Sequence, residues 1–214
     1  MAKQRFIDKI KQDLLKTGLQ ARSRQARLWL AKKVKEVRLN SGARLGFVNL
    51  GAKSRIASSR SKLSLGKMYF YFYDPKTKER LPYYDIMPLV IPIDYKPAVD
   101  SATGHDAGFL GLNLHYISPM KRMVLLDSLY TIATDDRFDE NTRIKMRYKL
   151  LANSKNLFSD ATPCLKWYLF KYFKSRALEI SADEWEISCF LPFEAFQKKS
   201  KEYVWKQSNK KANK

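Results

Sequence analysis

Acidic side chains between residues 74 and 106 are the part of this sequence that comes closest to an enzymatic site. A metal-dependent nuclease needs several carboxylates that converge on one cation, usually with a lysine nearby. Asp85 and Asp94 satisfy that requirement in principle, but Asp74 precedes a proline and is explained more simply as a turn residue. We therefore expect no catalytic carboxylate site. The carboxylates considered are Asp74, Glu79, Asp85, Asp94, Asp100 and Asp106.

Cysteine and histidine offer little further chemistry. Cys164 and Cys189 are the only cysteines and His105 and His115 the only histidines, and none of them has metal-ligand spacing. In a reducing compartment the two cysteines are expected to be ordinary, semi-buried thiols. The sequence also lacks a phosphate loop, a dinucleotide fingerprint and a nucleophile elbow. We expect a protein that is not an enzyme and that uses no metal and no cofactor.

Basic residues offer a different chemistry, the binding of phosphate. The net charge of +20 is unevenly spread, because residues 1–67 hold 18 Lys and Arg against 3 Asp and Glu, and residues 197–214 hold 7 against 1. Residues 68–196 are almost neutral, with 16 against 17. Two basic arms therefore flank a neutral, aromatic-rich middle. Such arms attract polyanions, so either nucleic acid or an anionic membrane is the expected partner.

Several observations favour nucleic acid over a membrane. The arginine-rich and serine-rich stretch after residue 40 has no bulky apolar insertions, and arginine binds phosphate in a bidentate manner. No apolar run approaches the roughly 18 residues that span a bilayer, and we expect no secretory signal. The predicted DNA contacts are Arg22, Arg24, Arg27, Lys32, Lys33, Lys35, Arg38, Arg44, Lys53, Arg55, Arg60, Lys62, Arg143, Arg147, Lys198 and Lys199.

The elements that must position these side chains begin with an amphipathic helix. Apolar residues at helical spacing predict helix over residues 3–39, with a break or bend at Gly18. Residues 40–67 have no period and are expected to form an extended linker. We thus divide the chain into a helical arm (1–39), the linker (40–67), one folded domain (68–196) and a basic C-terminal helix end and tail (197–214).

Strand-forming residues dominate the first half of the folded domain. Residues 68–73 and 81–85, joined by turn chemistry at Asp74-Pro75, predict a hairpin, and residues 87–95 and 109–117 continue the β pattern. Prolines confine parts of these strands to edges or bulges. The tyrosines of this region either pack in the core, which is their commoner fate, or stack on exposed bases. We expect a small, curved, barrel-like antiparallel sheet.

Helices are expected to follow the sheet, which makes the fold class α+β. Ser118 as N-cap and Pro119 in the first turn predict a helix to about residue 133. Further helices are predicted over about 141–152, over 163–178, and in a short segment around Trp185. A last helix is expected to carry the aromatic residues Phe193, Phe196, Tyr203 and Trp205.

Ordered short motifs in this part of the chain resemble a known family. Met68-Tyr-Phe-Tyr-Phe-Tyr-Asp-Pro-Lys-Thr-Lys78, Leu81-Pro-Tyr-Tyr-Asp85, Pro88-Leu-Val-Ile-Pro92, Gly108-Phe-Leu-Gly-Leu-Asn-Leu-His-Tyr116 and Phe190-Leu-Pro192 resemble the DNA end protector proteins of contractile-tailed phages. The resemblance covers roughly residues 67–207. It implies a virion protein that binds the terminus of the packaged linear genome, shields it from host exonuclease and helps head–tail joining. It implies no catalytic residues.

The sequence leaves two functions open. The first is a protein that holds the end of double-stranded DNA in the virion, at the head–tail junction, and in the host cytoplasm during assembly and after DNA ejection. Its partners would be the DNA terminus and portal, neck or tail proteins, with oligomers possible in the virion. The alternative is a structural neck, tail or baseplate component whose basic arms lace acidic neighbouring subunits without binding a DNA end.

Overall fold

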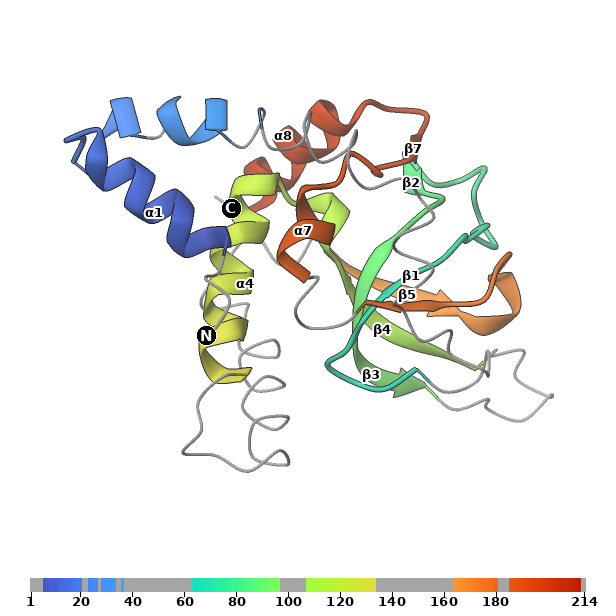
Figure 1. The fold of residues 1–214 in the computed structure, drawn as a ribbon. Coiled ribbons are helices and arrows are strands. Elements are labelled where there is room, and N and C mark those ends of the chain that lie inside the picture. Colours follow the sequence, from blue (N-terminus) through green and yellow to red (C-terminus); the bar gives the residue numbers. More distant parts are fainter. Residues whose placement is uncertain are drawn as a thin grey trace.

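A computed structural model describes residues 6–20, 23–26, 28–33, 36, 63–96, 107–133, 164–180 and 185–212. Figure 1 shows a β-sheet on one side of the molecule and most of the helices on the other, with the N-terminal helical segments beside helix α4. The fold therefore mixes helices and sheet, which is consistent with the expected α+β class. The predicted helix over 141–152, with Arg143 and Arg147, lies outside the described residues.

The main sheet has five antiparallel strands in the order β5-β4-β3-β1-β6. It is an open sheet, so the expected barrel-like closure is wrong. Closure requires long strands with a matched tilt and stagger, whereas β1 and β6 are each only three residues long. The strands are β1 (Met68–Phe70), β3 (Leu89–Lys96), β4 (Gly108–Asn113), β5 (Leu165–Leu169) and β6 (Leu178–Ile180).

The hairpin predicted for residues 68–73 and 81–85 is not formed. β1 pairs instead with β3 and β6, and residues 76–80 form the expected turn. Strand β2 (Tyr84–Asp85) pairs far along the chain with β7 (Phe196–Gln197) in a separate two-stranded sheet. The segment between β1 and β2 places β2 away from its predicted partner. β1 therefore pairs with strands from later in the sequence.

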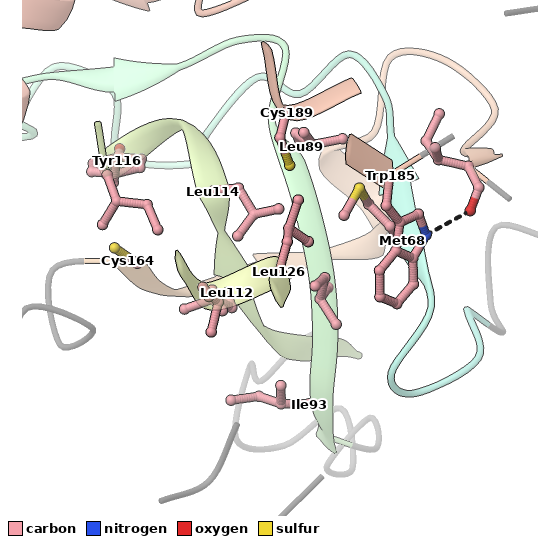
Figure 2. Close-up of a cluster of buried hydrophobic side chains, with 14 of the residues drawn as sticks. Met68, Leu89, Ile93, Leu112, Leu114, Tyr116, Leu126, Cys164, Trp185 and Cys189 are labelled. Atoms are coloured by element: carbon pink, nitrogen blue, oxygen red, sulfur yellow. Dashed lines mark hydrogen bonds between the residues drawn. The ribbon is translucent and has the colours of Figure 1, made fainter. Parts of the chain in front are cut away.

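Both faces of the main sheet are buried, and they differ in composition. The side chains of β1 alternate, so that Met68 contributes to one cluster and Tyr69 to the other, which Tyr71 joins just after the strand. The first cluster is mainly aliphatic and is covered by α4 (Pro119–Ala133), α7 (Trp185–Phe190) and α8 (Lys201–Ala212). Figure 2 shows this cluster, with the Trp185 indole N–H donating to the carbonyl of Ile180 at 3.0 Å.

The second cluster is built from aromatic rings. Tyr71 stacks on Phe173 with centroids 4.1 Å apart, and Phe109 stacks on Tyr168 at 5.4 Å. These rings pack against the sheet without a covering helix among the described elements. The core interpretation of the strand tyrosines is therefore confirmed for Tyr69, Tyr71 and Tyr73, each of which is buried. Leu63, near the end of the predicted linker, is also buried in this cluster.

Helix α4 begins as predicted, and one other predicted helix is wrong. The Ser118 carbonyl accepts the Arg122 N–H at 3.0 Å, and Pro119 opens the helix. Residues 163–178, predicted as helix, contain β5, the short 3₁₀ turn η4 (Phe170–Tyr172) and the start of β6. Strand β5 pairs with β4 along its whole length, and this tertiary pairing overrides the apolar pattern that was interpreted as helical.

The C-terminal half also corrects the last predicted helix. α8 begins at Lys201 and carries Tyr203 and Trp205, but Phe193 lies before it in a loop and Phe196 lies in β7. The short helix expected around Trp185 is present as α7. The expected strand over 87–95 is confirmed as β3, with its register shift next to Pro92.

The N-terminal segment docks on the helical side of the molecule. Helix α1 (Phe6–Lys16) ends before Gly18, whose φ of 69° confirms the predicted break. Helical turns resume at residues 24–26 and 28–33. Ile10 is buried against Met123 of α4 and Phe190 of α7. This segment therefore contacts the rest of the protein through a small apolar cluster and through an ion pair in which Lys11 Nζ lies 2.7 Å from Asp127 Oδ2.

Candidate nucleic-acid interface

The structure describes five of the predicted DNA contacts. Arg24, Lys32 and Lys33 lie on the N-terminal helical segments, and Lys198 and Lys199 precede α8. The other predicted contacts lie outside the described residues, and for all of them DNA binding stays a prediction. These are Arg22, Arg27, Lys35, Arg38, Arg44, Lys53, Arg55, Arg60, Lys62, Arg143 and Arg147.

The basic side chains of the N-terminal segment face solvent. Arg24 and Lys32 are exposed, whereas Ala26 of the same segment is buried. Lys33 lies 3.9 Å from Glu36, a long ion pair between exposed groups that contributes little to stability. An amphipathic helix anchored by its apolar side thus presents arginine and lysine outward, where they can reach phosphate oxygens.

Lys198 and Lys199 differ in their surroundings although they are neighbours. Lys198 has a positive φ of 70°, and its Nζ donates to the carbonyls of Lys78, Glu79 and Leu81 at 2.7, 2.9 and 2.9 Å. These bonds engage the three donors of the ammonium and tie the turn at 76–80 to the chain before α8. Lys199 is exposed, with Nζ 5.2 Å from the Tyr203 ring centroid. Lys199 is therefore the better placed of the two for an outside partner.

A pocket of about 390 Å³ opens between the segment from Tyr73 to Asp85 and strand β5. Its inner wall is formed by three buried tyrosines from different elements, and lysines and a tryptophan lie around it. Sequence reasoning missed it because residues 163–178 were assigned to a helix. The residues that line the pocket are Tyr73, Pro75, Lys76, Thr77, Leu81, Tyr84, Asp85, Tyr116, Lys166, Trp167, Tyr168 and Leu169.

A buried polar network holds the inner end of this pocket. Asp85 Oδ2 accepts from Asn113 Nδ2 at 3.2 Å and lies 2.7 Å from His115 Nδ1, while Asp85 Oδ1 accepts from the Met87 N–H at 3.1 Å. Asn113 Nδ2 also donates to the Tyr168 hydroxyl at 2.9 Å. Protein donors thus fix the Asp85 carboxylate in place, which explains how a charged group is accommodated where its side chain is almost fully buried.

The nuclease alternative finds no support in this arrangement. Asp94 lies on β3, is exposed, and accepts a hydrogen bond from the Tyr95 N–H, whereas Asp85 belongs to the buried network. Among the residues that the structure describes, no group of three His, Cys, Asp or Glu side chains could hold a metal ion. The described carboxylates therefore form no metal centre of the kind that such a nuclease needs.

Burial controls the ionisation of the tyrosines and of one cysteine. Desolvation raises the pKa of Tyr73, Tyr116 and Tyr168 above the usual range, so these pocket tyrosines stay neutral at physiological pH. Burial also raises the pKa of the Cys164 thiol to about 12. Neither cysteine forms a disulfide, and both are fully buried, so they are more enclosed than the semi-buried thiols expected from the sequence.

One arginine of the folded body has a purely internal role. Arg122 is fully buried, with Nη2 2.7 Å from Glu194 Oε1 and Nε donating to the carbonyls of Leu114 and Ile117 at 2.7 and 2.9 Å. Its Nη1 donates to the Cys189 carbonyl at 2.9 Å. Arg122 thus joins the end of β4 to α4 and α7, and it is unavailable to a ligand.

The fold and the placement of charge first define a class of protein. A mixed helix-and-sheet body carries basic side chains on solvent-facing helical segments, an arrangement suited to the phosphates of DNA. The family model described as the Phage T4 terminal DNA protecting protein matches residues 4–212. The match covers nearly the whole sequence, and the chain belongs to this family. It confirms the resemblance suggested by residues 67–207 and extends it to the basic N-terminal segment.

Two further comparisons returned nothing. Neither the search of curated proteins nor the search of solved structures found a match. Within the part of the chain that the structure describes, no helix has the length and apolar character needed to span a bilayer.

Proposed function

We propose that this protein binds the end of a linear double-stranded phage genome and protects it from exonuclease, without itself acting as an enzyme. The observation that carries the proposal is the family match, which runs through both basic ends of the chain. The exposed Arg24 and Lys32 support it, because cations that face solvent can reach DNA phosphates.

The basic arms provide the affinity in this proposal. If they neutralise about 6–10 phosphates, affinity falls roughly 10³- to 10⁵-fold between about 50 and 200 mM salt, because each contact releases condensed counterions. The neutral body then provides the shape that distinguishes a DNA end from the middle of a duplex. Affinity that barely changed with salt would rule out this role of the arms.

The test is exonuclease digestion of linear duplexes of two lengths over a range of protein concentrations. End protection predicts that the amount of protein needed scales with the number of ends and is independent of duplex length. Coating of the whole duplex by charge alone would instead require protein in proportion to length, and that result would contradict the proposal. An inert protein of equal net charge is the control.

The virion head–tail junction is the place we propose for this activity, with portal, neck or tail proteins as neighbours. The alternative, in which the basic arms lace acidic subunits, is separated by deleting residues 1–62, which retains the buried Leu63. Normal particles that deliver degraded genomes would favour end protection. Failed assembly with unchanged genome survival would favour lacing.

A further inference from the structure

We propose that the pocket between the segment from Tyr73 to Asp85 and strand β5 takes the terminal nucleotide of a DNA strand, with its base inside and its 5′-phosphate at the lysines. This inference deepens the proposed function and rests on it. It adds a specific site for the terminus to the general attraction of the basic arms.

The size and lining of the pocket fit this ligand. Its volume of about 390 Å³ lies within the range of small-ligand sites, which runs from about 300 to 1,000 Å³. Tyr73, Tyr116 and Tyr168 are nearly fully buried and form a fixed aromatic inner wall, while Trp167 is the exposed aromatic residue of the lining that a base can reach. Sites of this kind combine apolar and aromatic walls with a few fixed polar groups, and a nucleobase needs both.

The charged side chains of the pocket distinguish the phosphate of a nucleotide from its base. Lys166 Nζ is held 4.5 Å from the centroid of the Tyr116 ring, and Lys76 is an exposed residue of the pocket wall. Asp85 lies on the inner side, where its carboxylate is fixed by Asn113 and His115. A phosphate is attracted to the lysines and repelled by the carboxylate, so the lysine side of the pocket is the side that favours the phosphate.

Trp167 provides the stacking surface. Its side chain is 53% exposed although it belongs to β5, whose pairing with β4 runs from Leu165 to Leu169 and fixes the backbone that carries the indole. Base–aromatic stacking tolerates any base, because every base has a π-face. A tryptophan presented by a rigid strand thus suits a site that must accept a terminus irrespective of its sequence.

This site explains why an end is preferred to the middle of a duplex. A nucleotide enters a pocket only after it leaves the base stack, and this step costs least where pairing and stacking are weakest. A terminal base has one stacking neighbour, whereas an internal base has two. The pocket therefore accepts a frayed terminal nucleotide and leaves an intact internal base pair in place.

The experiment uses the full-length protein and a DNA hairpin with one open, 5′-phosphorylated end. 5-Iodouridine is placed at the 5′ terminus, at the 3′ terminus or at an internal position, and photo-crosslinked peptides are identified by mass spectrometry. We expect crosslinks from a terminal position to the segment that contains Trp167, and none to that segment from the internal position. The two terminal probes show which strand enters.

Binding of variants gives the second measurement. Trp167→Ala should weaken binding to the open hairpin by about 5- to 150-fold, the equivalent of one lost base stack, and Lys76→Ala with Lys166→Ala should remove the preference for a 5′-phosphate. Phe72→Ala and Lys171→Ala are the matched controls, because both residues are exposed and neither lines the pocket. The controls should bind like the wild type.

A closed dumbbell of the same sequence, used as competitor, separates the two possible failures. If the dumbbell competes as well as the open hairpin against the wild-type protein, the proposed function is wrong and this inference falls with it. If the wild type prefers the open end but the crosslinks lie elsewhere, or Trp167→Ala binds normally, only the pocket proposal is overturned.

Discussion

Arg122 and Lys198 of the sheet body are used differently from Arg24 and Lys32 of the N-terminal segment. In the body, Arg122 is fully buried against Glu194, and Lys198 donates to three backbone carbonyls. On the N-terminal segment, Arg24 and Lys32 are exposed. A buried charge must be paired because its desolvation is costly, whereas an exposed charge keeps its hydration until a partner arrives. The net charge of +20 therefore combines side chains with a structural role and side chains available to DNA.

The largest effect is expected from removing basic charge from the N-terminal segment. The variant changes Arg22, Arg24, Arg27, Lys32, Lys33, Lys35 and Arg38 to Gln. If each contacts one phosphate, the slope of log affinity against log salt decreases by about six, and affinity near 0.15 M salt falls roughly 10³-fold or more. Fluorescence titration at several salt concentrations measures this. Unchanged affinity in a folded variant would mean that these side chains bind something other than DNA.

For the buried charge of Arg122 we expect an effect on the stability of the fold. Arg122→Met leaves the Glu194 carboxylate without its cation, so the free energy of unfolding should fall by about 3–5 kcal/mol. Lys67→Met is the matched control, because the pair of Lys67 and Glu179 is partly exposed and contributes only about 0–1 kcal/mol. Urea unfolding measures both. Equal losses would contradict the distinction between the two kinds of cation.

Alkaline pH should lower the stability of the folded body, because its buried tyrosines and Cys164 have raised pKa values. Burial raises the pKa of Tyr71 and Tyr168 well above the usual range and that of Cys164 to about 12. The unfolded chain releases these protons from about pH 8.5–10, while the folded chain keeps them. Stability is therefore complete below that range and falls as pH rises through it, by up to about 1.4 kcal/mol per pH unit for each group. A urea midpoint that stayed constant to pH 11 would contradict this.

The smallest expected effect concerns two tyrosine hydroxyls in the aromatic cluster, those of Tyr71 and Tyr168. The Tyr71 hydroxyl is buried without a hydrogen-bond partner among the described residues, whereas the Tyr168 hydroxyl accepts from Asn113. Tyr71→Phe should therefore stabilise the fold by about 1 kcal/mol, and Tyr168→Phe should destabilise it by a similar amount. Thermal unfolding of the two variants gives the signs. Destabilisation by Tyr71→Phe would show that its hydroxyl has a partner.

Local signals in the sequence were enough for some of these elements. Ser118 and Pro119 predicted the start of α4, and Gly18 predicted the break after α1, because capping chemistry and positive φ depend on neighbouring residues. Strand β5 was missed because its five residues become a strand through pairing with β4, which lies far away in the sequence. The open order of the sheet and the pairing of β2 with β7 depend on distant contacts in the same way.

The candidate site likewise has features that local sequence predicts and features that depend on distant contacts. The distribution of charge indicated a polyanionic partner, and the arginine-rich stretch after residue 40 favoured nucleic acid, because neither feature needs a tertiary contact to be recognised. The pocket could not be predicted, since it joins Tyr73 to Trp167 and the sequence pattern places Trp167 in a helix rather than in β5. Likewise, Lys198 appeared equivalent to Lys199 in the sequence, but the fold directs its ammonium to the turn at 76–80.

The most direct test of end binding is exonuclease protection of a linear duplex in an excess of covalently closed circular DNA of the same sequence. The circle offers the same phosphates and the same bases but no terminus. We predict that protection survives the circle at physiological salt. Protection abolished by the circle would mean that the protein binds any duplex through its charge, and it would contradict a site for the DNA end.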